Sequence, residues 1–166
     1  MHSDVLGIYL NDHVAGATAG LELARRVARS HRRSALGPEL SRLVEEIDHD
    51  RRELLRLMEA LRIPVRRHKV LAGWVSEKAG RVKLNGRLLR RSPLSSLLEF
   101  EALRLGAEGK ACLWTALLPA ASAERPALDE SRLQHLLGRA REQISLLEDL
   151  RVRAAAGLFA GDRAPS

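Results

Sequence analysis

The stretch PELSRLVEEIDHDRRELLRLMEALRIP, residues 38–64, decides the fold class of this chain. A proline stands at each end of the stretch, and large apolar residues recur between the prolines at Leu40, Leu43, Ile47, Leu54, Leu57 and Leu61. This spacing places the apolar residues on one side of an α-helix, and Pro38 suits the first turn of such a helix. The stretch therefore predicts a helix that begins near Pro38, ends before Pro64 and buries one face.

Three other stretches show the same helical period. One runs from about Asp4 to Ser30, one begins after Pro93 and ends near Leu118, and one starts at Asp129, which suits an N-cap. Only 3% of the residues are aromatic, so leucine, alanine and valine must build the core, and this favours helices over strands. The sequence predicts one all-α domain over residues 1–160, followed by a disordered tail at residues 161–166.

The lengths of the connections predict how the helices pair. The break at Gly37-Pro38 and the loop at 119–126 are short, so each should join two antiparallel helices. About thirty residues separate the two pairs, and apolar residues recur there at helical spacing: Leu71, Trp74, Val75 and Val82. We therefore expect a long crossover that contains an extra short helix, with a turn at Asn85-Gly86. Two helical hairpins joined in this way form the layout of ferritin-like four-helix bundles.

Positive charge is concentrated in the expected crossover. Residues 62–91 hold ten lysines and arginines against one acid, Glu77, although the whole chain carries only +7. The segment is either a solvated face that keeps the protein soluble or a surface for an anionic partner. In the second interpretation the polyanion-binding residues would be Arg66, Arg67, Lys69, Lys78, Arg81 and Lys83. No aromatic platform accompanies these bases, which argues against recognition of single-stranded nucleic acid.

Several polar residues fall on the apolar sides of the expected helices. They are His13, Asp50, Glu99, Lys110 and Gln143, whereas Asn11 falls on the polar edge of its helix. A charge removed from water must find a partner, so we expect these five to form a buried polar network. Glu99 and Lys110 lie ~16 Å apart along one helix, so each needs a partner from another helix. The network either fixes the register of the helices or forms a metal or catalytic site.

Two segments resemble uncharacterised bacterial members of the ferritin-like superfamily. They are YLNDHVAG at residues 9–16 and LEFEALRLGAEGK at residues 98–110. In the metal-active relatives, the first and third helices each supply a glutamate, and the second and fourth each supply Glu-x-x-His. The resemblance therefore implies a di-iron site in the bundle wherever those four ligand sets are complete.

This chain departs from that ligand pattern in two of the four helices. The second helix offers Glu46-Ile47-Asp48-His49 and the third offers Glu99. The first helix has His13 and Ala17 where a glutamate is wanted, and the fourth has Glu142-Gln143 with serine at position 145. We therefore predict a degenerate site with no standard di-iron centre and no cofactor. An unusual metal site, if one forms, would use Glu46, His49, Asp50 and Glu99.

Few other features point to chemistry. No glycine-rich phosphate loop is present, and Cys112 lies among apolar residues, which predicts an inert core thiol. Gly16, Gly20, Gly106 and Gly109 are interpreted as places where helices approach closely. The single cysteine and the lack of a signal peptide or a long apolar run predict a cytoplasmic protein without a membrane span.

These observations favour a binding or structural role over an enzyme. The alternatives are a metal-binding ferritin-like enzyme or storage protein with unusual ligands, and a polyanion binder that works through the basic crossover. The expected first and third helices have apolar arcs wider than half of the helical wheel. We expect the crossover to cover one of these faces through Leu71 and Trp74, and a homodimer to cover the other.

Overall fold

The computed structural model describes residues 2–66, 93–121 and 128–160. The described residues form four long helices and no strand: α1 (His2–His31), α2 (Gly37–Ala60), α4 (Pro93–Leu117) and α5 (Glu130–Ala160). A 3₁₀ turn, η1 (Leu118–Ala120), follows α4. For the described residues the predicted all-α class with four long helices is confirmed, and each of the four is longer than twenty residues. The predicted crossover helix and the predicted tail lie outside the described residues.

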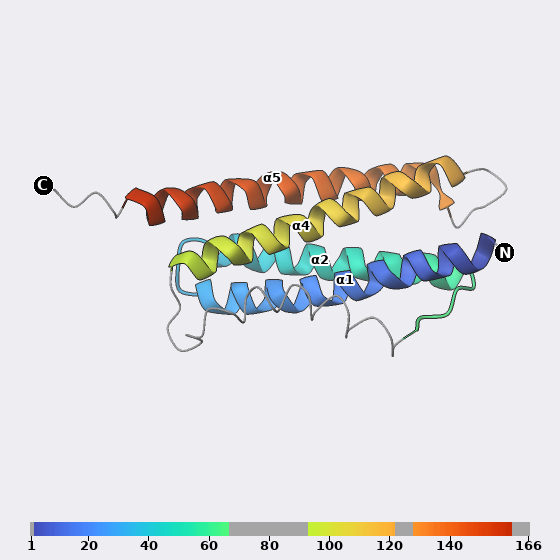
Figure 1. Ribbon diagram of the computed structural model, residues 1–166, viewed down its shortest axis with the longest axis horizontal. Coiled ribbons are helices and arrows are strands. Elements are labelled where there is room, and N and C mark those ends of the chain that lie inside the picture. The colour runs from blue at the N-terminus through green and yellow to red at the C-terminus, as the bar shows by residue number, and fades with distance from the viewer. Residues whose placement is uncertain (1, 67–92, 122–127, 161–166) are drawn as a thin grey trace, which may run out of the picture.

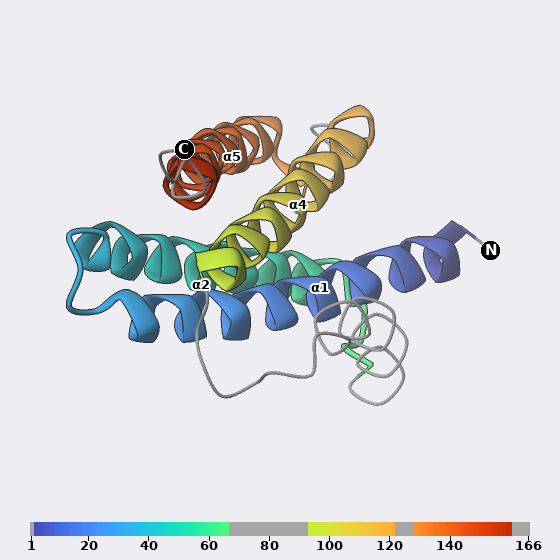
Figure 2. The same ribbon diagram turned by 60° about the vertical axis from the view of Figure 1, so that its left-hand side comes forward.

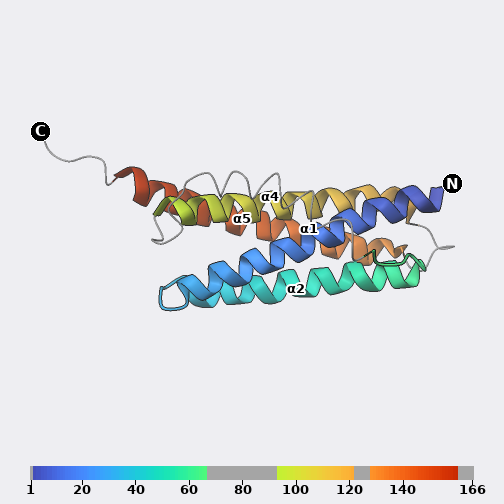
Figure 3. The same cartoon turned by 60° about the horizontal axis from the view of Figure 1, so that its bottom comes forward.

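The four helices form two antiparallel hairpins. A short turn joins α1 to α2, and α4 and α5 run side by side above that pair (Figure 1). Figure 2 shows α4 crossing obliquely over the α1–α2 pair. Figure 3 shows that α1 and α2 lie next to each other at the turn that joins them. Among the described residues, no helix is long and apolar enough to cross a membrane.

Local sequence signals set the helix ends. At the α1–α2 turn, a Cβ on Gly37 would lie 3.0 Å from the backbone oxygen of Arg32, so the close approach of the backbone favours glycine. At the start of α5, Asp129 Oδ1 accepts a hydrogen bond from the backbone N–H of Arg132 at 2.7 Å, as predicted for an N-cap. At the end of α2, Arg62 takes a left-handed backbone with φ of 57°. The backbone N–H of Ile63 then donates to the oxygen of Met58, which completes a Schellman-type cap.

Asn11 lies in the interior, so its predicted place on the polar edge of the first helix is wrong. Its side chain is only 5% exposed. The amide Nδ2 donates to the backbone oxygens of Gly7 and Pro64, and Oδ1 accepts from the backbone N–H of Arg66 at 2.7 Å. Asn11 therefore forms hydrogen bonds with polar backbone groups of the segment that follows α2, and it holds this segment against α1. A helical wheel shows one helix by itself, so it cannot reveal a contact with another segment of the chain.

The hydrophobic core is divided into two clusters. One cluster fills the end of the bundle near the α4–α5 connection and contains Leu10, Leu54, Met58, Leu113, Trp114, Leu117, Leu133 and Leu137. The other fills the end near the α1–α2 turn and contains Val27, Leu40, Leu43, Phe100, Leu103, Leu147 and Leu150. Between these clusters lies the middle layer of the bundle, which we call the waist. The buried polar residues Asp50 and Gln143 lie in this layer.

Candidate functional site

The waist of the bundle holds a compact polar cluster centred on Asp50. The Asp50 side chain is 2% exposed. Its Oδ2 accepts hydrogen bonds from Lys110 Nζ at 2.6 Å and from Gln143 Nε2 at 3.0 Å. Lys110 Nζ also donates to Gln143 Oε1. Three helices, α2, α4 and α5, therefore meet through one carboxylate, one ammonium and one amide.

A second cation, Arg139, lies on the other side of Asp50. Arg139 Nη2 is 3.0 Å from Asp50 Oδ1, but the geometry does not suit a hydrogen bond, so this contact is an ion pair. Arg139 also donates to the backbone oxygen of Glu46 at 3.2 Å, and its Nη1 lies 2.9 Å from His49 Nδ1. Two side-chain cations thus compensate the buried Asp50 carboxylate, which would be very costly to bury alone.

The cluster continues as a polar seam between α2 and α5. Glu46, His49, Asp50 and Glu53 share one face of α2, because they are spaced by three or four residues. Arg132 of α5 donates to Glu53 Oε2 through Nε at 2.8 Å, and Arg56 pairs with Glu53 Oε1. Burial raises the pKa of Glu53, but the hydrogen bond and charge of Arg132, together with the charges of Arg56 and His49, outweigh this effect and hold that pKa below its usual range. Long side chains therefore bridge the two helices.

Lys110 is held by hydrogen bonds to Asp50 and Gln143. Burial lowers the pKa of its ammonium below the usual range, and the charge and hydrogen bond of Asp50 offset part of that effect. The short contact with Asp50 favours the charged form at neutral pH. Lys110 therefore acts as a buried cation that is held by its neighbours.

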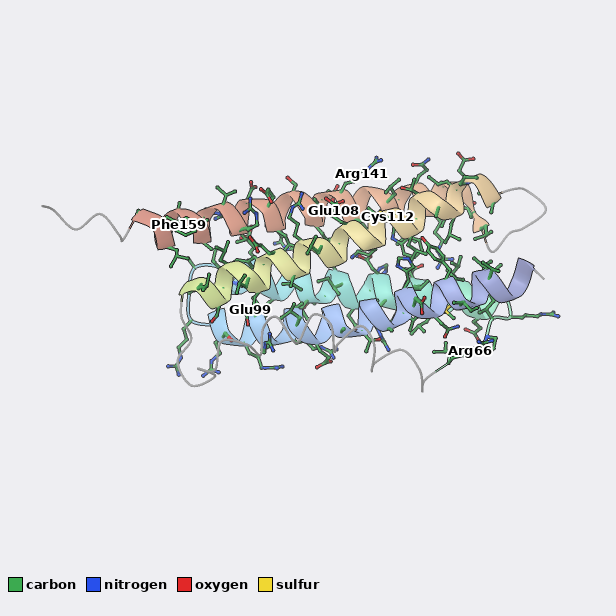
Figure 4. The ribbon with its side chains drawn as sticks, in the orientation of Figure 1. Arg66, Glu99, Glu108, Cys112, Arg141 and Phe159 are labelled. Carbon is green, nitrogen blue, oxygen red and sulfur yellow. The ribbon has the colours of Figure 1, made fainter. Side chains whose placement is uncertain are left out.

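The structure brings together three of the five residues predicted to form the network and separates the other two. Asp50, Lys110 and Gln143 are in direct contact. Glu99 instead lies 3.4 Å from Arg26 of α1, with 16% of its side chain exposed, and Figure 4 shows it near the N-terminal end of α4. His13 packs edge-on against the Tyr9 ring, with 4.6 Å between the ring centroids. Glu99 and His13 therefore make these contacts outside the Asp50 cluster.

Sequence reasoning missed Arg139, His49 and Glu53 as members of the seam. A signal for Arg139 was present, because it precedes Gln143 by four residues and so shares its face of α5. His49 lies beside the apolar stripe of α2, yet its ring reaches both Arg139 and Glu53. Long side chains reach inward from positions beside the apolar stripe, so the position of a residue on the helical wheel does not by itself exclude it from an interior cluster.

The proposed unusual metal ligands do not converge. Glu99 is paired with Arg26, whereas Asp50 is held by Lys110, Arg139 and Gln143. Within residues 2–66, 93–121 and 128–160, no three histidine, cysteine or acidic side chains are grouped closely enough to hold a metal ion. The oxygens of Asp50 therefore face side-chain cations and an amide.

A cavity of about 660 Å³ opens beside the polar cluster, between α1 and α4. Gly16, Gly20, Gly106 and Gly109 line its walls, and a Cβ added at any of them would meet no atom within 4 Å. The interpretation of these glycines as points of close helix approach is therefore wrong. Further lining residues come from all four helices and include Tyr9, His13, Ile47, Asp50, Leu103, Lys110, Trp114, Gln143 and Leu147. The cavity is mainly apolar, with the Asp50–Lys110–Gln143 cluster on one side.

His13 makes the folded state sensitive to acid. Burial lowers the pKa of His13 below its usual 6.5, against a smaller opposite effect from Asp12. The unfolded chain then binds more protons than the folded protein below about pH 6.5, so we expect stability to be complete above that pH and to fall below it. Urea unfolding at pH 7.5 and pH 5.5 measures the change. His13→Gln should show a smaller fall than the wild type, and an equal fall would contradict this assignment.

Two other predicted residues lie at the surface. Cys112 is exposed, so the prediction of a core thiol is wrong. Arg66 extends away from the bundle (Figure 4). The remaining residues of the predicted polyanion-binding surface, from Arg67 to Lys83, lie outside the described residues.

Comparisons with known proteins found no relative of this chain. No protein-family model, curated protein or solved structure matches the chain.

Proposed function

We propose that this chain is a ferritin-like bundle that serves as a binding protein, and that the cavity between α1 and α4 takes a small, largely apolar molecule. The observation that carries the proposal is the cavity itself, with a volume of about 660 Å³. Ligand sites of proteins are typically apolar clefts of about 300–1,000 Å³ with a few polar groups that orient the ligand. Here Lys110 and Gln143 are such groups.

The charge arrangement at the waist supports a binding role over metal chemistry. In metal-active bundles of this layout, metal ions compensate carboxylates that project inward from facing helices. In this chain Lys110 and Arg139 compensate Asp50, and Gln143 bridges it to Glu46. A metal-binding enzyme or storage protein would need these cations to move away from Asp50.

A cavity-blocking variant tests the proposal. The probe is 2-ethylnaphthalene, and binding is followed by shifts of backbone and indole N–H resonances in NMR spectra. Gly106→Leu should weaken binding at least about tenfold, because the new side chain fills space that the probe needs. Gly138→Leu is the matched control, since Gly138 also has no atom within 4 Å of an added Cβ but does not line the cavity. Equal binding by both variants, or no binding by the wild type, would contradict the proposal.

Three finer expectations stay predictions. The polyanion-binding surface has only Arg66 among the described residues. Support for a homodimer comes from three exposed leucines of α4 at helical spacing, Leu94, Leu98 and Leu105. The cytoplasmic location rests on the sequence features alone.

A further inference from the structure

Trp114 brings a buried hydrogen-bond donor to the cavity. Its side chain is 1% exposed and lines the cavity. Its Nε1 has no hydrogen-bond acceptor in the part of the chain that the structure describes. A buried indole N–H normally finds a partner, because an unsatisfied donor loses its hydrogen bonds to water without replacement. The indole N–H is therefore an unused donor just beneath the wall of the cavity, and an acceptor in the cavity reaches it once the side chains that cover it shift.

Lys110 brings a second donor to the same face of α4. It precedes Trp114 by four residues, so the two side chains lie about one turn, or ~6 Å, apart along the helix. An ammonium group has three N–H bonds, and Asp50 and Gln143 accept two of those of Lys110. Among the described residues no acceptor takes the third. Two donors from one helix face thus border one cavity.

The charges of the residues that line the cavity are balanced, and Arg139, which pairs with Asp50 from the other side, does not line the cavity. Asp12 and Asp50 carry negative charge, and Arg51 and Lys110 carry positive charge. Arg51 is also held by Thr18, whose Oγ1 accepts from Arg51 Nε at 3.0 Å. A carboxylate or ammonium ligand would add an uncompensated charge to a largely apolar space, which disfavours binding of either. A neutral hydrogen-bond acceptor pairs with the donors and leaves the net charge of the lining unchanged.

We propose that the ligand is an uncharged molecule with a mainly apolar body and one carbonyl-type acceptor, as in a ketone, ester or amide, and that the acceptor bonds to Trp114 and Lys110. This inference rests on the proposed binding function and deepens it. The donors set the position of the carbonyl group. The apolar body then extends along the glycine-lined walls toward Leu103, Ile47 and Leu147.

Three probes of similar shape test the ligand class on the full-length protein. They are 2-acetylnaphthalene, which carries the acceptor, 2-ethylnaphthalene, which lacks it, and 2-naphthoate, which is an anion. We expect the ketone to bind roughly fivefold to tenfold more tightly than the ethyl compound, the factor that a net hydrogen bond supplies. We expect naphthoate to bind more weakly than both. The ketone should move the indole N–H resonance of Trp114 further downfield than the ethyl compound does, and Trp114→Phe identifies that resonance by its loss.

Each outcome decides between the two proposals. Equal binding of the ketone and ethyl compound would overturn the acceptor while leaving the binding cavity in place. Tightest binding of naphthoate would overturn the neutral ligand in favour of an anionic one. Binding of none of the probes would overturn both proposals. Trp114→Phe should lower the ketone's advantage over the ethyl compound, and an unchanged advantage in a folded Trp114→Phe variant would remove Trp114 from the site.

Discussion

Replacing Asp50 by alanine should lower the free energy of unfolding by about 3–5 kcal/mol, because the variant leaves buried positive charge without its carboxylate. Lys110 and Gln143 both donate to Asp50 Oδ2, and Arg139 lies 3.0 Å from Oδ1. Each of these groups loses a partner at once. Urea unfolding at pH 7.5 measures the loss. A change below about 1 kcal/mol would mean that water reaches the waist and that the cluster is not buried.

The matched variants separate the carboxylate from the cation. Lys110→Met should cost less than Asp50→Ala, because Asp50 keeps Arg139 and the Gln143 amide as partners. In the double variant the uncompensated lysine is gone, so its total cost should be smaller than the sum of the two single costs. Strictly additive costs would show that Asp50 and Lys110 do not interact.

Replacing the cavity glycines by alanine should stabilise the protein. Gly16, Gly20, Gly106 and Gly109 lie in helix interiors, where glycine is about 1 kcal/mol less favourable than alanine. An added Cβ at any of the four would meet no atom within 4 Å, so no clash opposes this gain. The fourfold variant should therefore gain up to about 4 kcal/mol, measured by urea unfolding, if the four effects add.

A fifth glycine supplies the control for that series. Gly37→Ala should destabilise the protein, because its Cβ would lie 3.0 Å from the backbone oxygen of Arg32. The fourfold alanine variant should also bind 2-ethylnaphthalene more weakly, since four methyl groups reduce the cavity volume. A loss of stability in the fourfold variant would show that α1 and α4 pack together more closely than the structure has them.

The sequence by itself determined the helices and the inward-facing polar residues. The apolar period of residues 38–64 and the breaks at Gly37-Pro38, Pro64 and Pro119 predicted the elements, because both signals are local properties of the backbone. The N-cap at Asp129 was found in the same way. Asp50, Lys110 and Gln143 were placed on inner faces because the position of a residue on a helix follows from its number.

Only the tertiary structure decided which residues meet and where space is left. Glu99 pairs with Arg26, Asn11 holds the chain after Pro64, and Arg139 reaches Asp50 across the gap between α2 and α5. The same holds for Gly16 and Gly106, which fit a close helix contact by sequence but line a cavity in the structure. The helical period fixes the direction of each residue around its own axis. The distance and crossing angle between two axes depend on the packing of all four helices together.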